Sequence, residues 1–226
     1  MLDNRIIAIT VSTNYSDILP YTLANNLRYF DHWYIVTSSQ DLLTHQCIRE
    51  QNSEKITVLN WEFQNQEPDP VRPGEFTVRH FDKGGAIRHA QQQAYQQWLN
   101  HWYLVMDTDI LIRSGRDLIT QHLCPDYIYG PAARLDYASY QDYEQGQIHR
   151  NYFTQGPEII GFFQLYHRPR LYQPSWDSNW CDVEFTRLWQ EGDRKILAMT
   201  VDHLGYWAED VACTHRGRRL GMGFKS

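Results

Sequence analysis

Two aspartates, two positions apart, follow an apolar run near the middle of the chain. Residues 102–106 are all apolar, and Asp107-Thr108-Asp109 comes directly after them. Such a short run is typical of a strand buried on both faces, whereas carboxylates are rarely buried without partners. We therefore expect both aspartates where this strand ends, at the edge where open α/β sheets bind ligands. Residues i and i+2 of an extended chain point the same way, so both carboxylates can reach one Mg²⁺ or Mn²⁺ ion and, through it, a diphosphate.

The same stretch has a second interpretation. Aspartate is frequent in turns because its side chain bonds its own backbone, and an aspartate-rich turn without any ligand also explains the pair. Both interpretations place Asp107 and Asp109 just after a strand. The predicted strands and helices around them therefore determine which other residues lie nearby.

The first half of the chain alternates between predicted strands and helices. The strands are predicted at 5–13, 33–36 and 56–59, and the helices at about 19–30, with Ser16 as N-cap, and at about 41–50. This alternation implies parallel strands joined by right-handed crossovers. Residues 65–75 hold three prolines and a glycine and are predicted to be a loop. A long helix is predicted from 82 to 99, directly before the apolar run.

The regular alternation fades beyond residue 112. Strands are predicted at 127–130 and 159–166, a short helix at 182–190, and a basic, glycine-rich tail follows. We expect one domain, 1–226, in which residues 1–112 and 113–226 form two halves of one α/β fold.

Composition excludes several classes of protein. A net charge of −6 argues against a nucleic-acid partner. The four cysteines form no CxxC pair, which argues against structural zinc and disulfides. The sequence shows no signal peptide and no transmembrane segment, so we expect a soluble, cytoplasmic protein. The 14% aromatic content suits sugar rings or bases, or simply a bulky core. The oligomeric state cannot be inferred from these features.

Four stretches in order give the chain a resemblance to a known family. They are Thr37-Ser38-Ser39-Gln40-Asp41, the segment 81–88, Asp107-Thr108-Asp109, and the pair formed by 180–185 and His203-Leu204-Gly205. Together they resemble a GT-A glycosyltransferase of the kind related to glycosyltransferase family 2 and other nucleotide-sugar transferases. Arg88 stands where that family often has Asn, and Cys181 where it usually has Glu.

The resemblance implies a GT-A-like (Rossmann-like) fold, in which a mostly parallel sheet is flanked by helices and the C-terminal half is less regular and faces the acceptor. It implies transfer of a sugar from a nucleotide-sugar, with UDP-sugars favoured, to a glycan or other acceptor hydroxyl. The implied cofactor is Mn²⁺ or Mg²⁺, held by Asp107, Asp109 and His203. Thr108 is then counted with Asp107 among the donor-binding residues.

Further candidate residues take their roles from position and charge. Lys83 and Arg88 are cations near a helix N-terminus, where backbone N–H groups favour anions. Thr13, Tyr15 and Asp41 follow the first two strands and could line a pocket for base and ribose. Each of these also has a plain interpretation as a solvated cation, a loop residue or a helix cap.

An inverting transfer needs one carboxylate to take the proton of the attacking hydroxyl. Asp182 is the candidate base, and Glu184 is its rival. Both could instead be acidic residues in the first turn of a helix. His203 could be an ordinary core or surface histidine, and Asp202 could replace it as a ligand.

Two other functions stay open. A sugar-nucleotide nucleotidyltransferase would use a related sheet, but residues 12–16 lack the glycine-rich loop usual after its first strand. A non-catalytic carbohydrate-binding protein would use the aromatic surface without nucleotide or metal.

Overall fold

The computed structural model describes residues 5–62, 64–68, 76–113, 123–154, 159, 161–173 and 181–204. The basic tail, Gly205 and Trp180 lie outside these residues. Within them, no helix is both long enough and apolar enough to cross a membrane.

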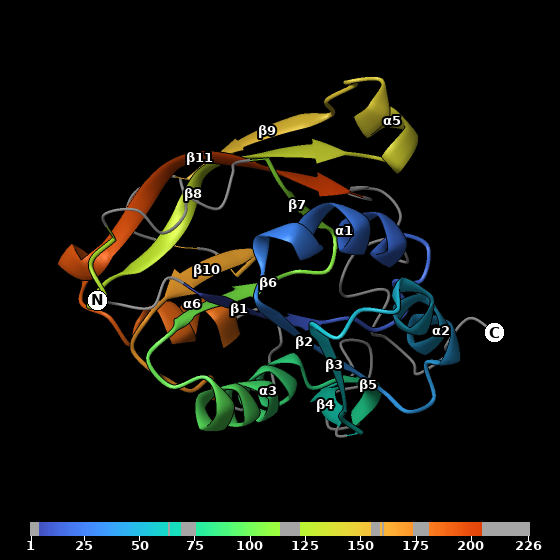
Figure 1. Cartoon of the computed structure of the whole chain (residues 1–226), viewed down its shortest axis with the longest axis horizontal. Coiled ribbons are helices and arrows are strands. Elements are labelled where there is room, and N and C mark those ends of the chain that lie inside the picture. The colour runs from blue at the N-terminus through green and yellow to red at the C-terminus, as the bar shows by residue number, and fades with distance from the viewer. Residues whose placement is uncertain are drawn as a thin grey trace.

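The first half of the chain builds a parallel sheet (Figure 1). Its strands are β1 (Ile6–Val11), β2 (His32–Thr37), β3 (Ile56–Asn60) and β6 (Trp102–Met106), in the order β3-β2-β1-β6. All three pairings are parallel. The strands are rich in β-branched and aromatic residues, and β1 and β6 are buried along their whole length. The predicted alternation and its parallel pairing are confirmed.

Four strands between residues 128 and 204, together with a short strand at 110–112 at the end of the first half, extend this sheet with mixed pairing. The added strands are β10 (Phe163–Tyr166), β8 (Ile128–Tyr137), β11 (Arg194–Leu204) and β7 (Ile110–Ile112), in the order β6-β10-β8-β11-β7, with β9 (Arg150–Phe153) on β8. Strands β8 and β11 are parallel, and the other new pairings are antiparallel. The expected α/β class is therefore confirmed, with a sheet that is parallel in its first part, flanked by helices and less regular in the C-terminal half.

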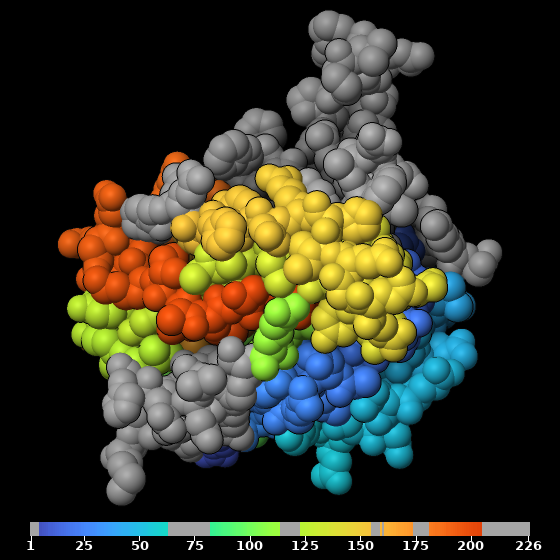
Figure 2. Space-filling view, turned by 90° about the horizontal axis from the view of Figure 1, so that it is seen from above, coloured from blue at the N-terminus to red at the C-terminus, as the bar shows by residue number. Residues whose placement is uncertain are grey.

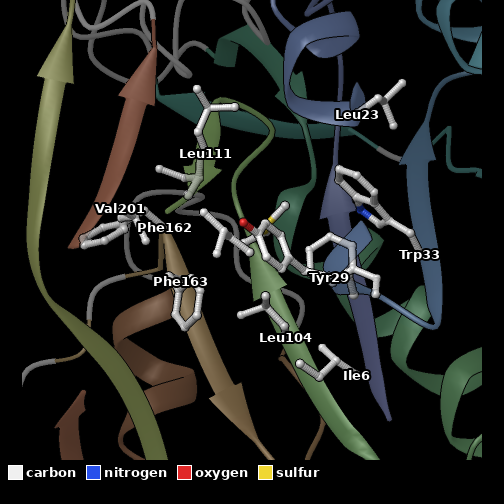
Figure 3. Close-up of a cluster of buried hydrophobic side chains, with 14 of the residues drawn as sticks. Ile6, Leu23, Tyr29, Trp33, Leu104, Leu111, Phe162, Phe163 and Val201 are labelled. Atoms are coloured by element: carbon white, nitrogen blue, oxygen red, sulfur yellow. The ribbon is translucent and has the colours of Figure 1, made fainter. Parts of the chain in front are cut away.

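Helices cover both faces of the sheet. On one face, α1 (Leu19–Asn26), the 3₁₀ turn η1 (Leu27–Tyr29) and α2 (Leu42–Gln51) pack on Ile6, Trp33 and Leu104. Figure 3 shows this cluster, which continues through Leu111 and Phe162 to Val201. On the other face, α3 (Lys83–Gln97) and α6 (Cys181–Thr186) pack on the alternate residues of β1 and β6. Burying both faces leaves the strand ends as the place for polar chemistry.

Two smaller elements complete the described chain. Helix α5 (Tyr140–Glu144) lies against α1, where the rings of Tyr21 and Tyr140 stack at 3.8 Å and 10°. Figure 2 shows the yellow residues of α5 beside the blue ones of α1. The 3₁₀ turn η2 (Glu191–Asp193) leads directly into β11.

Several predicted boundaries were wrong. Helix α1 begins at Leu19 with Ile18 as N-cap, not Ser16, because a turn in which Tyr15 O accepts from Ile18 N and Leu19 N precedes it. The predicted loop 65–75 contains part of β4 (Gln64–Pro68), which pairs with β5 (Phe76–Phe81) in a separate two-stranded sheet. Hydrogen bonding to β5 allows residues 64–68 to form a strand, although the proline-rich composition of the segment predicted a loop.

Candidate functional site

The Asp107-Thr108-Asp109 segment lies where β6 ends, as expected. Thr108 Oγ1 donates to Val11 O at 2.8 Å, which ties the segment to the end of neighbouring β1. Asp107 N donates to Phe162 O at 3.2 Å, just before β10 begins. The next strand, β7, pairs with β11 and not with β6. Asp107 and Asp109 therefore face different neighbours.

Asp107 is paired with Lys83. The Asp82 carboxylate caps α3 by accepting from Gly85 N at 2.9 Å, which makes Lys83 the first residue of the helix. From there Lys83 Nζ reaches Asp107 Oδ1 at 2.6 Å, and both residues are buried. A buried carboxylate and ammonium at this distance stabilise each other's charged forms. The predicted cation at the start of this helix therefore contacts one member of the predicted acidic pair, Asp107.

Asp109 faces His203 instead. His203 Nε2 lies 3.3 Å from Asp109 Oδ2, and His203 Nδ1 lies 3.0 Å from Asp136 Oδ1. Arg134 Nε in turn lies 2.7 Å from Asp136 Oδ1. The sequence did not indicate Asp136 or Arg134, because nothing in residues 134–158 forms a local motif.

The protonation of His203 follows from these contacts. Burial by itself would lower the pKa of His203, but the charge of Asp109 and the hydrogen bond with Asp136 outweigh it and raise the pKa to about 9, from an ordinary value of 6.5. At neutral pH the imidazole is therefore cationic and sits between two carboxylates. Burial by itself would raise the pKa of the Asp136 carboxyl, but His203 and Arg134 outweigh it, so this pKa lies below its ordinary value.

A dependence of stability on pH follows. The pKa of His203 is higher in the folded protein than in the unfolded chain. Its contribution to the free energy of unfolding is therefore complete at pH values below the pKa in the unfolded chain, and it is lost as the pH rises through the pKa in the folded protein. In the metal-free protein, the free energy of unfolding should fall by about 2 kcal/mol between about pH 7 and about pH 10 from this group. Denaturant titrations across that range measure it. A His203→Gln variant with an equally steep decline would contradict the assignment.

Asp182 lies on the Lys83 side of the site. Gly161 N donates to Asp182 Oδ2 and Val183 N donates to Asp182 Oδ1, each at 2.8 Å. Burial raises the pKa of Asp182, Lys83 lowers it, and Asp107 raises it again. The balance is a raised pKa, which suits a group that accepts a proton near neutral pH. Glu184, the rival, is exposed on the same helix.

Gly161 is required by this arrangement. A Cβ built at Gly161 would lie 2.2 Å from both Cβ and Oδ2 of Asp182. We expect Gly161→Ala to destabilise the protein by about 1–3 kcal/mol through overpacking, seen as a fall of about 5 °C in Tm by calorimetry. Gly192→Ala is the matched control, because its Cβ meets no atom within 4 Å. Equal Tm values for the two variants would show that Asp182 is not held as described.

The remaining candidates are dispersed. Asp41 caps α2, accepting from Thr44 N at 3.2 Å, and its other oxygen accepts from Asn14 N at 2.8 Å. Tyr15 is buried in the core cluster beneath α1, with 3% of its surface exposed. The Arg88 guanidinium donates to Tyr172 O and Gln173 Oε1. These contacts give each residue a structural role at its position.

Thr13 differs from these three residues. Its hydroxyl and that of Ser12 are buried, and among the described residues neither has a hydrogen-bond partner. Buried hydroxyls are normally paired, so two unpaired ones at the end of β1, beside the segment at 107–109, are notable.

The side chains near Asp109 could provide some of the ligands that a divalent cation needs. In the part of the chain that the structure describes, no three His, Cys, Asp or Glu residues converge on one point. Asp109 and His203 do lie side by side, and Mg²⁺ or Mn²⁺ sites often use one or two protein ligands, with waters and substrate phosphates completing the shell. Asp107 is engaged by Lys83. His203 must lose its Nε2 proton before it can bind a cation, so binding should release protons.

No protein family is matched by the sequence, and no curated protein sequence matches it. Solved structures similar to the chain include a 4-diphosphocytidyl-2C-methyl-D-erythritol synthase, with 17% identity over 88% of this chain and 90% of that chain and a TM-score of 0.45. The synthase of that name from Anaerococcus prevotii has 12% identity, covers 95% of each chain and has a TM-score of 0.41. The galactosyltransferase LgtC, in complex with donor and acceptor sugar analogues, has 10% identity, 94% and 93% coverage and a TM-score of 0.42. At these identities and scores the likenesses carry no argument about the site.

Proposed function

We propose that the chain is a glycosyltransferase that moves a sugar from a nucleotide-diphosphate sugar to an acceptor hydroxyl. One observation carries the proposal. At the end of β6, Asp107 pairs with Lys83 and Asp109 pairs with His203, while the separate carboxylate of Asp182 lies close enough to Lys83 for the two charges to interact. Charge-stabilising groups and a proton acceptor thus share one edge of the sheet.

The leaving diphosphate sets the first requirement. Negative charge develops on it as the bond to the sugar breaks, and preorganised positive groups lower the barrier. Lys83 supplies such a charge at the N-terminus of α3, where backbone N–H groups also favour anions. A Mn²⁺ or Mg²⁺ ion would add Lewis-acid stabilisation when bound. Asp109 and His203 would hold it, and Asp107 orients Lys83.

The attacking hydroxyl sets the second requirement. Asp182 accepts two backbone hydrogen bonds, which fix its carboxylate and leave further lone pairs for a proton. Its raised pKa suits it to take the acceptor's proton. A base acting on the side opposite the leaving group gives inversion at the anomeric carbon. Thr13, with Ser12 beside it, would contact the nucleotide.

A thermal-shift screen of nucleotide sugars tests the proposal. Ligand at about 100 times its Kd stabilises the folded state by about 2.7 kcal/mol, so UDP-sugar with Mn²⁺ should raise Tm by about 5 °C. The rise should shrink when EDTA removes the metal. Pyrophosphate release from a nucleoside triphosphate and a sugar phosphate would show a nucleotidyltransferase instead. Glycan binding with no response to any nucleotide would show a carbohydrate-binding protein.

A further inference from the structure

Strand β11 places His203 between two acidic residues. Its neighbour β8 is parallel to it, and His203 is the register partner of Asp136 there. Its other neighbour, β7, is antiparallel, and His203 is the partner of Ile110, the residue after Asp109. Leu204 N also donates to Asp109 O at 2.8 Å. Because register partners project to the same face of a sheet, this ladder places Asp136 beside His203. Asp109 stands in the turn just before β7, and from there its Oδ2 lies 3.3 Å from His203 Nε2.

Asp136 is itself held in place. Its side chain is fully buried, and Arg134 contacts both carboxylate oxygens, Nε to Oδ1 at 2.7 Å and an Nη to Oδ2 at 3.3 Å. The Arg134 guanidinium lies over the rings of Phe162, at 4.9 Å, and Tyr152, at 5.4 Å. The aromatic rings and Asp136 therefore restrain the guanidinium, and the guanidinium restrains the carboxylate that faces His203 Nδ1.

We propose that Asp136 is a positioning residue that orients the His203 imidazole so that Nε2 faces Asp109 and the cation that the two would share. This inference rests on the proposed function, since it assigns a role within the cation site proposed there. A histidine that binds metal through one ring nitrogen commonly donates the other N–H to a carboxylate, which fixes the tautomer and ring orientation. Asp136 accepts at the nitrogen that would remain free.

A purely structural ion pair is the competing explanation, and the chain contains a matched example. Asp202, the residue before His203, is equally buried and pairs with Arg113, whose Nε lies 2.5 Å from Asp202 Oδ2. Among the described residues, no hydrogen bond or ion pair joins its carboxylate to the side chain of His203 or Asp109. Asp202→Asn and Asp136→Asn therefore make the same chemical change in neighbouring strands, but only one of them reaches His203.

The experiment is a double-mutant cycle on Mn²⁺ affinity, measured by calorimetry in the presence of UDP. Asp136→Asn should weaken Mn²⁺ binding about 10-fold, at the lower end of the range for carboxylates that support a metal ligand. In a His203→Ala background the same change should have less than about a two-fold effect, because the oriented group is gone. Asp202→Asn should leave Mn²⁺ affinity unchanged. Circular dichroism checks that each variant is folded.

The outcomes separate the two proposals. If the unmodified protein binds no Mn²⁺ with UDP, the metal-dependent function and this inference both fail. If it binds Mn²⁺ and His203→Ala weakens binding, the inference alone is overturned by unchanged affinity in Asp136→Asn, by an equal loss in Asp202→Asn, or by a loss that persists without His203. Should Asp136→Asn not fold, Asp136→Glu keeps the charge and moves the carboxylate, and it should show the same dependence on His203.

Discussion

Asp109→Asn is expected to lower kcat/KM for sugar transfer about 1,000-fold, because it removes the negative charge that would hold the proposed cation and that faces the His203 imidazolium at 3.3 Å. The amide keeps the size of the carboxylate, and Leu204 N still bonds the Asp109 carbonyl, so the turn between β6 and β7 should persist. Initial rates with a UDP-sugar and excess Mn²⁺ measure the loss. Asp107→Ala should also remove activity, since it leaves Lys83 without the carboxylate 2.6 Å away that orients it.

Asp202→Asn is the control for this variant. It neutralises an equally buried aspartate that bonds Arg113, away from the site, so its activity should stay within about two-fold of the unmodified protein if it folds. Full activity in Asp109→Asn, or in protein stripped of metal with EDTA, would contradict the proposed mechanism.

Asp182→Asn should lower kcat by about 100- to 10,000-fold while the Kd for donor stays nearly unchanged, because general-base catalysis contributes in that range. The amide cannot take a proton, but it can still accept the bond from Gly161 N that holds the side chain. Single-turnover rates and UDP titrations separate chemistry from donor binding.

Glu184→Gln is the matched control, a carboxylate two residues further along α6 that is exposed. It should retain transfer within about two-fold. An Asp182→Asn protein that loses donor binding but transfers normally per bound donor would show that Asp182 is not the base. A large loss in Glu184→Gln would move that role to the rival residue.

Local features of the sequence determined the part of the site that contains Lys83 and Asp107. The apolar run at 102–106 forms β6, the aspartate segment follows it, and Asp82 caps α3 so that Lys83 is its first residue. Each of these depends on residues close together in the chain, such as a buried strand, a capping side chain or a polar residue where a strand stops. The parallel first half of the sheet follows from the same local alternation.

Only the tertiary structure decided how the two aspartates divide their partners. Asp136 and His203 are 67 residues apart, and β11 was not predicted as a strand at all. Tyr15, expected near a base, is in the core because the turn before α1 directs it inward. Which residues of two distant strands lie side by side depends on the register of their pairing. A shift of the register by one residue would move every side chain of a strand to the opposite face of the sheet. Hydrophobic periodicity describes each strand by itself, so it could place Asp109 at a strand end but not beside His203.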